Sequence, residues 1–398
     1  MKKNFVSKLC LILILIAAVL TLKSDAYAYT PQSLYDEVWK LVCSKYVDQD
    51  NNGQSWQKWR HKYDDYLKTD EDAYVAIDTM LLSLNDPYTR FLTPDEFEEE
   101  GSAISGTLKG IGVQIGVKDG KLTVIAPIED TPAAKAGLQA NDYIVEIDGK
   151  STKGMTVKDA ADKIRGEEGT FVKLLIRRGS IDKVYSIPRA EIQLKAISTT
   201  PPEKFALNNR IGYIRLSTFM NKGTTAEFAS ALEKLKGKSG YIIDLRSNPG
   251  GLLSNAIFIS DMLISGGTIV STVDRDGYKE PARASKRVTT TKPIVVLING
   301  GSASASEILS GALKDNGRAT LVGEKTFGKG LVQEINKLSG GSGLNITTQK
   351  YLTPNGTDIN KKGITPDYEV KLTEADIEQG KDPQLAKAQA VLLQQIGN

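Results

Sequence analysis

The sequence predicts a multidomain protein with a helical N-terminal segment, a small β/α domain and a larger α/β core. Three changes of pattern along the chain support this fold class. Residues 30–100 carry apolar side chains at helical spacing, the apolar period changes to two from about residue 104, and strands alternate with helices after residue 205. Alternation of the last kind is typical of buried parallel strands, and functional groups gather where such strands end and helices begin.

The helical segment at 29–100 begins with Thr30-Pro31, an N-cap followed by a proline that fits the first turn. All three tryptophans of the chain fall within this segment. We expect a small helical packing unit here. An oligomer contact is the alternative, and a homodimer is the oligomeric state we favour.

Residues 1–28 have the three parts of a secretory signal peptide. The start is basic, Leu9 to Leu22 is almost unbroken apolar sequence, and Ala26-Tyr27-Ala28 matches the small-x-small cleavage pattern. The apolar run is shorter than the roughly 20 residues that span a bilayer. We therefore expect export and an extracytoplasmic location, with an uncleaved segment that associates with a membrane as the alternative.

The charge balance excludes some classes of partner. The whole sequence has 51 basic and 48 acidic residues, and removal of residues 1–28 takes away four lysines and one aspartate, which leaves a neutral chain. A neutral balance does not favour nucleic acid or an anionic membrane surface. Cys43 is the only cysteine beyond residue 28, so neither an intrachain disulfide nor a cysteine-based metal site is expected, and no cofactor is implied.

Residues 101–191 show short strands and two short helices in an order that resembles a PDZ domain. The carboxylate-binding loop of that domain would be the glycine-rich segment Gly110-Ile111-Gly112-Val113. Glycines let successive backbone N–H groups converge on a terminal carboxylate, and an exposed strand edge can then accept an extended peptide as an added strand. An ordinary small β/α domain with a glycine turn is the alternative.

The core at 192–371 is predicted from apolar strands that are each followed by a helix. The strands are expected at 211–216, 241–245 and 293–298, and the helices at about 224–235, 252–264 and 305–315. A further capped helix from Asp382, within the final segment 372–398, is expected to dock on the core or on a partner subunit.

Ser304 follows the third core strand in a glycine-rich bend and begins a helix. This is the geometry that exposes a nucleophilic oxygen above a sheet, and N–H groups at the helix start can face a developing oxyanion. A structural role is the alternative, because Ser304-x-x-Glu307 is also a capping box. Ser302 and Ser306 are competing serines in the same bend.

Lys329 lies in a second glycine-rich bend, Phe327-Gly328-Lys329-Gly330. Residues 323–330 nearly match the phosphate-binding pattern G-x-x-x-x-G-K-[ST], but Gly330 stands in place of the Ser/Thr and strand-like sequence follows, so no nucleotide site is expected.

The only histidine, His61, lies far upstream in a charged stretch, which leaves lysine as the best remaining base for a serine nucleophile. A lysine acts as a base only as the neutral amine, a form that burial favours. Gln333, four residues after Lys329, could orient the amine without charging it.

Four segments in register resemble the carboxyl-terminal processing peptidases, also called tail-specific proteases. The segments are Asp244–Gly251, Gly301–Glu307, Phe327–Gln333 and Gly363–Asp367. The resemblance covers essentially the whole chain after residue 28, in the family's order of helical segment, PDZ domain and core. It implies that the core is ClpP/crotonase-like.

The resemblance also implies the roles of individual residues. Ser304 would be the nucleophile, Lys329 the general base and Gln333 the residue that positions the lysine. The oxyanion hole would consist of backbone N–H groups of Gly250 or Gly251 and of Ala305.

The function implied by the resemblance is that of a serine endopeptidase. Its PDZ domain would capture the apolar C-terminal tail of a protein, which is then cleaved near that end. Arg165 is either a residue that couples the PDZ domain to the core or ordinary surface. Asp315, credited with a functional role in some members, is expected to be a solvated residue at a helix end.

Two other functions are the alternatives. A catalytically inactive PDZ adaptor would use only the peptide groove. A trypsin-like protease with a trailing PDZ domain is disfavoured, because the PDZ segment comes first here and the required histidine is missing.

Overall fold

The computed structural model describes residues 29–118, 120–128, 131–202, 205–373, 375–376 and 379–397. The expected signal peptide at 1–28 lies outside these residues. Within the described ranges, no helix combines the length and the apolar character that a membrane crossing requires.

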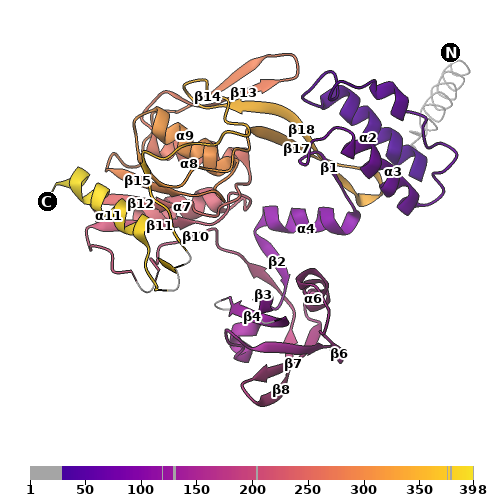
Figure 1. Ribbon diagram of the computed structural model, residues 1–398, viewed down its shortest axis with the longest axis horizontal. Coiled ribbons are helices and arrows are strands. Elements are labelled where there is room, and N and C mark those ends of the chain that lie inside the picture. The colour runs from indigo at the N-terminus through magenta and orange to yellow at the C-terminus, as the bar shows by residue number, and fades with distance from the viewer. Residues whose placement is uncertain are drawn as a thin grey trace, which may run out of the picture. The chain divides into compact units, whose positions relative to one another are not determined.

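The chain forms two compact units. One contains residues up to Phe97 together with 333–347, and the other contains residues 98–332 together with 348–398. The first unit corresponds to the expected helical packing unit, and the second contains both the β/α domain and the α/β core (Figure 1).

The first unit is built on α2 (Pro31–Lys45), the 3-10 helix η1 (Trp56–Trp59) and α3 (Asp70–Leu82). The predicted N-cap is confirmed, because the Thr30 hydroxyl accepts a hydrogen bond from the Ser33 N–H at 3.0 Å. The three tryptophans are buried in one apolar cluster with side chains of α2 and α3.

The sequence analysis did not predict that a strand would interrupt the helical segment. Strand β1 (Arg90–Leu92) pairs antiparallel with residues 343–345 of β18 (Gly343–Leu352). A 3-10 turn, η2 (Ser339–Gly341), precedes β18, and helix α4 (Pro94–Ser105) follows β1.

The β/α domain is an antiparallel sheet of order β3-β4-β5-β7-β8, with β6 added beside β5. Helix α6 packs against β3 and β5. One cluster of buried apolar side chains contains residues of both α6 and the sheet. Strand β3 lies at the edge of the sheet. The elements are β2 (Thr107–Gly110), β3 (Val113–Lys118), β4 (Lys121–Pro127), α5 (Pro132–Ala136), β5 (Tyr143–Ile147), β6 (Lys150–Ser151), α6 (Val157–Ile164), β7 (Phe171–Arg178), β8 (Ile181–Pro188) and β9 (Ala190–Gln193), the last paired with β2.

The core is a six-stranded sheet of order β10-β11-β12-β15-β16-β19, in which all neighbours except β10 and β11 run parallel. The strands are β10 (Ile197–Ser198), β11 (Ile211–Leu216), β12 (Gly240–Asp244), β15 (Ile294–Ile298), β16 (Thr320–Gly323) and β19 (Tyr368–Glu369).

Helices cover both faces of this sheet (Figure 1). Side chains such as Ile243 and Val296 pack with α7, α8 and α9 on one face, whereas Ile242 and Val295 pack with α11 on the other. The predicted helices are confirmed to within about two residues, and they are α7 (Thr224–Lys234), α8 (Leu253–Leu263), α9 (Ala305–Asp315) and α11 (Pro383–Ile396).

A second sheet was not predicted. Strands β13 (Thr268–Asp274) and β14 (Lys279–Arg283) form a hairpin, and β13 also pairs with residues 349–352 of β18. Strand β17 (Leu331–Lys337) pairs with β18. The parallel order of β12 and β15 places the bend after each strand at the same edge of the core sheet, and the candidate site lies there.

Candidate active site

Ser304 lies in the turn that connects β15 to α9 and is the N-cap of α9. Its backbone has φ 54° and ψ −114°, in the left-handed half of conformational space that a residue with a side chain rarely adopts. The residue is partly exposed. This is the strained strand–turn–helix arrangement that presents a nucleophile above a sheet.

The two competing serines of the bend have structural roles. Ser302 and Ser306 are fully buried. The Ser302 hydroxyl donates to the Leu245 carbonyl oxygen at 2.8 Å, and the Ser306 hydroxyl donates to the Asn248 carbonyl oxygen at 2.9 Å. Ser304 is therefore the serine of this bend whose oxygen a substrate can reach.

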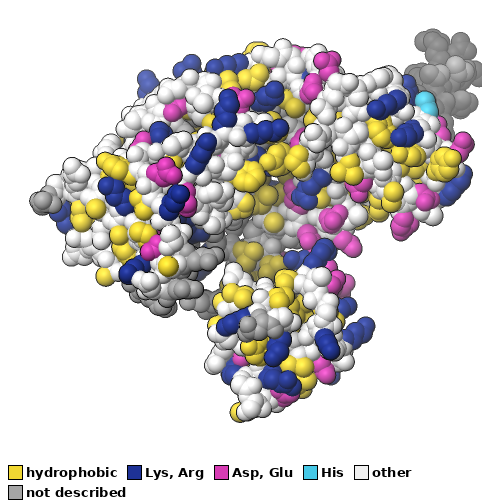
Figure 2. Space-filling view, viewed as in Figure 1, with side chains coloured by type: hydrophobic (Ala, Val, Ile, Leu, Met, Phe, Trp, Pro, Cys, Tyr) yellow, Lys and Arg dark blue, Asp and Glu magenta, His cyan; other side chains and the backbone are white. Residues whose placement is uncertain are grey.

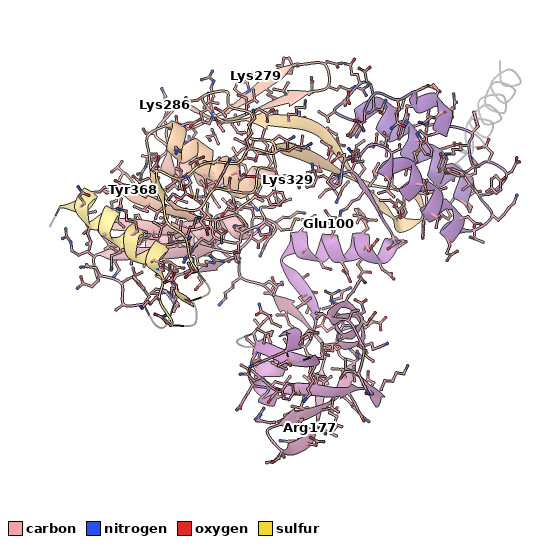
Figure 3. The ribbon with its side chains drawn as sticks, in the orientation of Figure 1. Glu100, Arg177, Lys279, Lys286, Lys329 and Tyr368 are labelled. Carbon is pink, nitrogen blue, oxygen red and sulfur yellow. The ribbon has the colours of Figure 1, made fainter. Side chains whose placement is uncertain are left out.

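Lys329 lies in the loop between β16 and β17 and is partly buried (Figure 3). The strand β17 follows this loop, as the sequence predicts. The loop needs glycine at Gly328, where φ is 91° and an added Cβ would lie 2.9 Å from the backbone nitrogens of Lys362 and Gly363.

A buried carboxylate joins the two bends. The Glu307 side chain is 0% exposed, and its Oε2 accepts hydrogen bonds from the backbone N–H groups of Ser304 and Lys329, each at 2.9 Å. Its Oε1 accepts from the Thr326 hydroxyl at 2.5 Å and from the Gly328 N–H at 2.7 Å. The residues predicted as nucleophile and base therefore flank a single oxygen atom.

The sequence analysis missed this role of Glu307. The Ser304-x-x-Glu307 spacing was interpreted only as a capping box, and the carboxylate half of that box is present. The bonds to the Lys329 loop involve residues about twenty positions further along the chain, and capping rules contain no information on them.

Of the two glycines of the predicted oxyanion hole, Gly250 packs against Ser304, whereas Gly251 lies against the backbone of Phe219 and Met220. An added Cβ on Gly250 would lie 2.9 Å from the Ser304 Cβ and 2.6 Å from the Ala303 carbonyl oxygen. The Gly250 N–H already donates to Asn248 Oδ1 at 2.9 Å. For the N–H groups of Gly251 and Ala305, the described residues supply no acceptor, and their role as oxyanion donors stays a prediction.

Gln333 lies in β17 and belongs to the first compact unit. Its side-chain nitrogen donates to the Thr347 hydroxyl at 3.2 Å. That bond fixes the amide within its own unit, and the predicted contact with the Lys329 amine stays a prediction.

The remaining polar candidates have ordinary surroundings. His61 is exposed on the surface of the first unit (Figure 2) and lies 3.0 Å from the Asp64 carboxylate. Asp315 is the last residue of α9, at the opposite end of the helix from Ser304, and its carboxylate accepts a hydrogen bond from the Asn355 N–H at 3.0 Å. Among the described residues, no group of His, Cys, Asp and Glu side chains is arranged to hold a metal ion.

The glycine-rich loop of the β/α domain connects β2 to β3. The Ala133 N–H donates to the Ile111 carbonyl oxygen at 2.8 Å, and the Thr131 hydroxyl donates to that of Gly112 at 3.1 Å. The N–H groups of Ile111 and Gly112 have no acceptor among the described residues. Val113 then begins the edge strand β3, so free N–H groups and an open strand edge adjoin each other.

Arg165 is the C-cap of α6, beside this loop. Its guanidinium forms an ion pair with Glu99 of α4 and lies 3.6 Å from Asp162. The structure thus shows an acidic partner for Arg165, while the predicted coupling to the core stays a prediction.

Comparison with known proteins gives the class of the molecule. Residues 210–370 match Peptidase family S41, and residues 123–178 match the PDZ domain. The carboxyl-terminal-processing protease of Picosynechococcus sp. (strain ATCC 27264 / PCC 7002 / PR-6) is 41% identical over 375 residues, which cover 92% of this chain and 90% of that protein. The chloroplastic carboxyl-terminal-processing peptidase 2 of Arabidopsis thaliana is 37% identical over 390 residues, which cover 92% and 76%.

Among solved structures, a photosystem II D1 C-terminal processing protease superposes with a TM-score of 0.58. It is 35% identical in sequence, and the match covers 86% of this chain and 94% of that one. The chain therefore belongs to peptidase family S41, as a member with a PDZ domain.

Its relatives are carboxyl-terminal processing proteases, and the protein is a serine-type endopeptidase that acts on protein substrates. The predicted family and fold class are confirmed, and the inactive-adaptor alternative is set aside.

Proposed function

We propose that Ser304 is the nucleophile and Lys329 the general base of this endopeptidase, with Gln333 orienting the lysine. The observation that carries the proposal is the shared Glu307 oxygen, which binds the N–H groups of both Ser304 and Lys329. Two bends 25 residues apart in sequence are brought together by that atom. Ser304 and Lys329 are both partly exposed.

The proposed reaction is acyl transfer in two steps. The neutral Lys329 amine removes the proton of the Ser304 hydroxyl while the serine oxygen attacks the peptide carbonyl carbon. The resulting ammonium gives its proton to the leaving amine as the peptide bond breaks, which forms an acyl-enzyme. Water then attacks the ester with the same lysine as base, and Ser304 is released as the hydroxyl.

The oxyanion of each step would be bound by the N–H groups of Gly251 and Ala305. Within the described part of the chain both groups lack an acceptor, whereas the Gly250 N–H is already bonded to Asn248. Of the two glycines predicted for this role, we therefore favour Gly251 as the donor. Gly250 supports it by close packing on Ser304 without a side chain.

The PDZ domain is proposed to capture the apolar C-terminal tail of the substrate. The free N–H groups of Ile111 and Gly112 would bind the terminal carboxylate, and β3 would pair with the extended tail. We further propose extracytoplasmic action, from the signal-like residues 1–28, and we keep membrane association and a homodimer as parts of the proposal.

The dyad is tested with single alanine variants. Ser304→Ala and Lys329→Ala should each lower the turnover of an unfolded test protein by more than about 10³-fold, because nucleophile and base act as one unit. Lys325→Ala is the matched control, since Lys325 is an exposed lysine of the same loop. Full turnover in either dyad variant would contradict the assignment.

Tail capture is tested with two versions of one substrate, one complete and one without its last few residues. The complete version should have the lower KM, and mass spectrometry of the products should place the cut near its C-terminus. Equal KM values for the two versions would refute recognition of the tail while leaving the dyad intact.

A further inference from the structure

We propose that Glu307 is the positioning residue that sets the distance between nucleophile and base. Thr326 and the Gly363–Asp367 segment keep the Glu307 carboxylate and the Lys329 bend in place. The inference rests on the proposed function of Ser304 and Lys329 and assigns roles that the dyad alone does not include.

Glu307 gathers donors from two separate stretches of the chain, the start of α9 and the loop between β16 and β17. Ser304 is at the start of α9, Thr326 is in the loop after β16, and Gly328 and Lys329 form the second bend. All four hydrogen bonds to the carboxylate are between 2.5 and 2.9 Å long, two on each oxygen. The carboxylate thus holds the backbone of the nucleophile and the backbone of the base directly, with no intervening side chain.

The two carboxylate oxygens of Glu307 match the number of donors that surround them. Its two oxygens together offer about four acceptor positions, and four donors occupy them here. A glutamine at this position would have one acceptor oxygen, and its NH₂ group would face two of the donors. Because Glu307 is 0% exposed, no solvent is available to bind the donors that lose their partner.

Thr326 anchors the lysine side of this arrangement. Its hydroxyl donates to Glu307 and also accepts from the Ile364 N–H at 2.7 Å, and its own N–H donates to the Ile364 carbonyl oxygen at 3.1 Å. A Cβ on Gly363 would lie 2.3 Å from the Thr326 carbonyl oxygen, so only glycine allows this approach. The Gly363–Asp367 motif therefore packs against Thr326 and supports the loop that carries Lys329.

The consequence concerns the chemical step and not substrate binding. A displacement of about 1 Å between reacting groups can cost roughly 10²-fold in rate. Loss of one hydrogen bond on Oε1 would let the Lys329 bend move relative to α9. The PDZ groove and the oxyanion donors do not depend on that bond, so KM should be preserved.

Thr326 provides the sharpest test, because one substitution can remove its hydroxyl and another can keep it. Thr326→Val removes the bridge at nearly constant shape and should lower kcat about tenfold with KM unchanged. Thr326→Ser keeps the hydroxyl and should restore kcat to within about twofold of the unsubstituted enzyme. Thr353→Val is the control, because Thr353 is also buried but its hydroxyl has no partner among the described residues, so its kcat should not change.

Glu307→Gln should lower kcat by about 10²-fold, and its melting temperature is measured beside it so that a loss of fold is recognised. Thr326→Val and Thr326→Ser decide the question even if that variant does not fold.

Equal kcat in Thr326→Val and Thr326→Ser, or a rise in KM without a fall in kcat, would overturn the positioning role. If Ser304→Ala and Lys329→Ala remain active, the proposed function and this inference fall together. If both are inactive while Glu307→Gln and Thr326→Val keep full kcat, only the inference fails.

Discussion

The end of β12 and the start of α9 each contain a buried carboxylate, and the two are satisfied by different kinds of donor. Asp244 is 1% exposed and Glu307 is 0% exposed. Asp244 accepts from the guanidinium groups of Arg246 at 2.7 Å and Arg215 at 2.8 Å and from the Tyr213 hydroxyl at 2.8 Å. Glu307 accepts from backbone N–H groups and one hydroxyl.

The difference separates a structural site from the proposed active site. The cations at Asp244 belong to side chains, and Arg246 extends to Asp382 at the start of α11, so this carboxylate connects elements of the fold. The donors at Glu307 are the backbone groups of the proposed reacting residues. We therefore expect changes at Asp244 to affect the free energy of unfolding and changes at Glu307 to affect kcat.

The largest effect on stability is expected for Asp244→Asn. The substitution keeps the shape but leaves Arg215 without its anion and leaves Arg246, 11% exposed, with Asp382 as its remaining acidic partner. Removal of one partner from a buried ion pair costs about 3 kcal/mol. Denaturant unfolding should show a loss of that order, with kcat per folded molecule unchanged. A fall in kcat without a loss of stability would contradict the separation of roles.

The same carboxylate predicts an acid limit of stability. Burial raises the pKa of Asp244, but the hydrogen bonds and positive charges of Arg246 and Arg215 outweigh this, and the pKa lies below the ordinary aspartate value of 3.8. A lowered pKa adds stability above pH 3.8, and that contribution is lost as the pH falls through the folded-state pKa. The difference in unfolding free energy between the natural protein and Asp244→Asn should be constant from pH 7 to 5 and shrink in stronger acid.

The smallest effects are expected for two tyrosines whose hydroxyls donate hydrogen bonds, one to Asp244 and one to the Ser304 carbonyl oxygen. Tyr213→Phe removes the bond to Asp244 and should cost about 1 kcal/mol of stability with kcat unchanged. Tyr351→Phe removes the bond to the Ser304 carbonyl oxygen, 3.2 Å long, and should lower kcat a few-fold. Thermal melts and steady-state kinetics measure both effects. A loss of kcat in Tyr213→Phe, or an unchanged kcat in Tyr351→Phe, would contradict the comparison.

The sequence was sufficient for the elements whose signals are local. Strand β15 is a run of five apolar residues, and α9 begins at a Ser-x-x-Glu pattern, so both were predicted with nearly correct ends. The tryptophan-rich helices were predicted for the same reason.

Elements that depend on distant partners were missed. Strand β1 has three residues and exists because it pairs with β18, about 250 positions later. The β13–β14 hairpin also needs β18 for support, and its outer strand is largely exposed and carries no apolar alternation. Register between remote segments is set by tertiary packing, which a single sequence does not display.

The candidate site shows the same limit in its chemistry. Ser304 and Lys329 could be named because glycine-rich bends after strands are recognisable, and the family resemblance paired them. Glu307 could be named only as a helix cap. Its bonds to Thr326, Gly328 and Lys329 depend on how two loops approach each other in space, which spacing rules cannot supply.

The backbone of Ser304 is strained, and this strain lowers the stability of the folded protein. A φ of 54° with ψ of −114° suits glycine, and a serine held there is destabilised by about 1–3 kcal/mol. Glycine at this position would relax the turn and give a more stable protein, but it would remove the proposed nucleophile. At this one residue the proposed catalytic role requires serine, whereas thermal stability favours glycine.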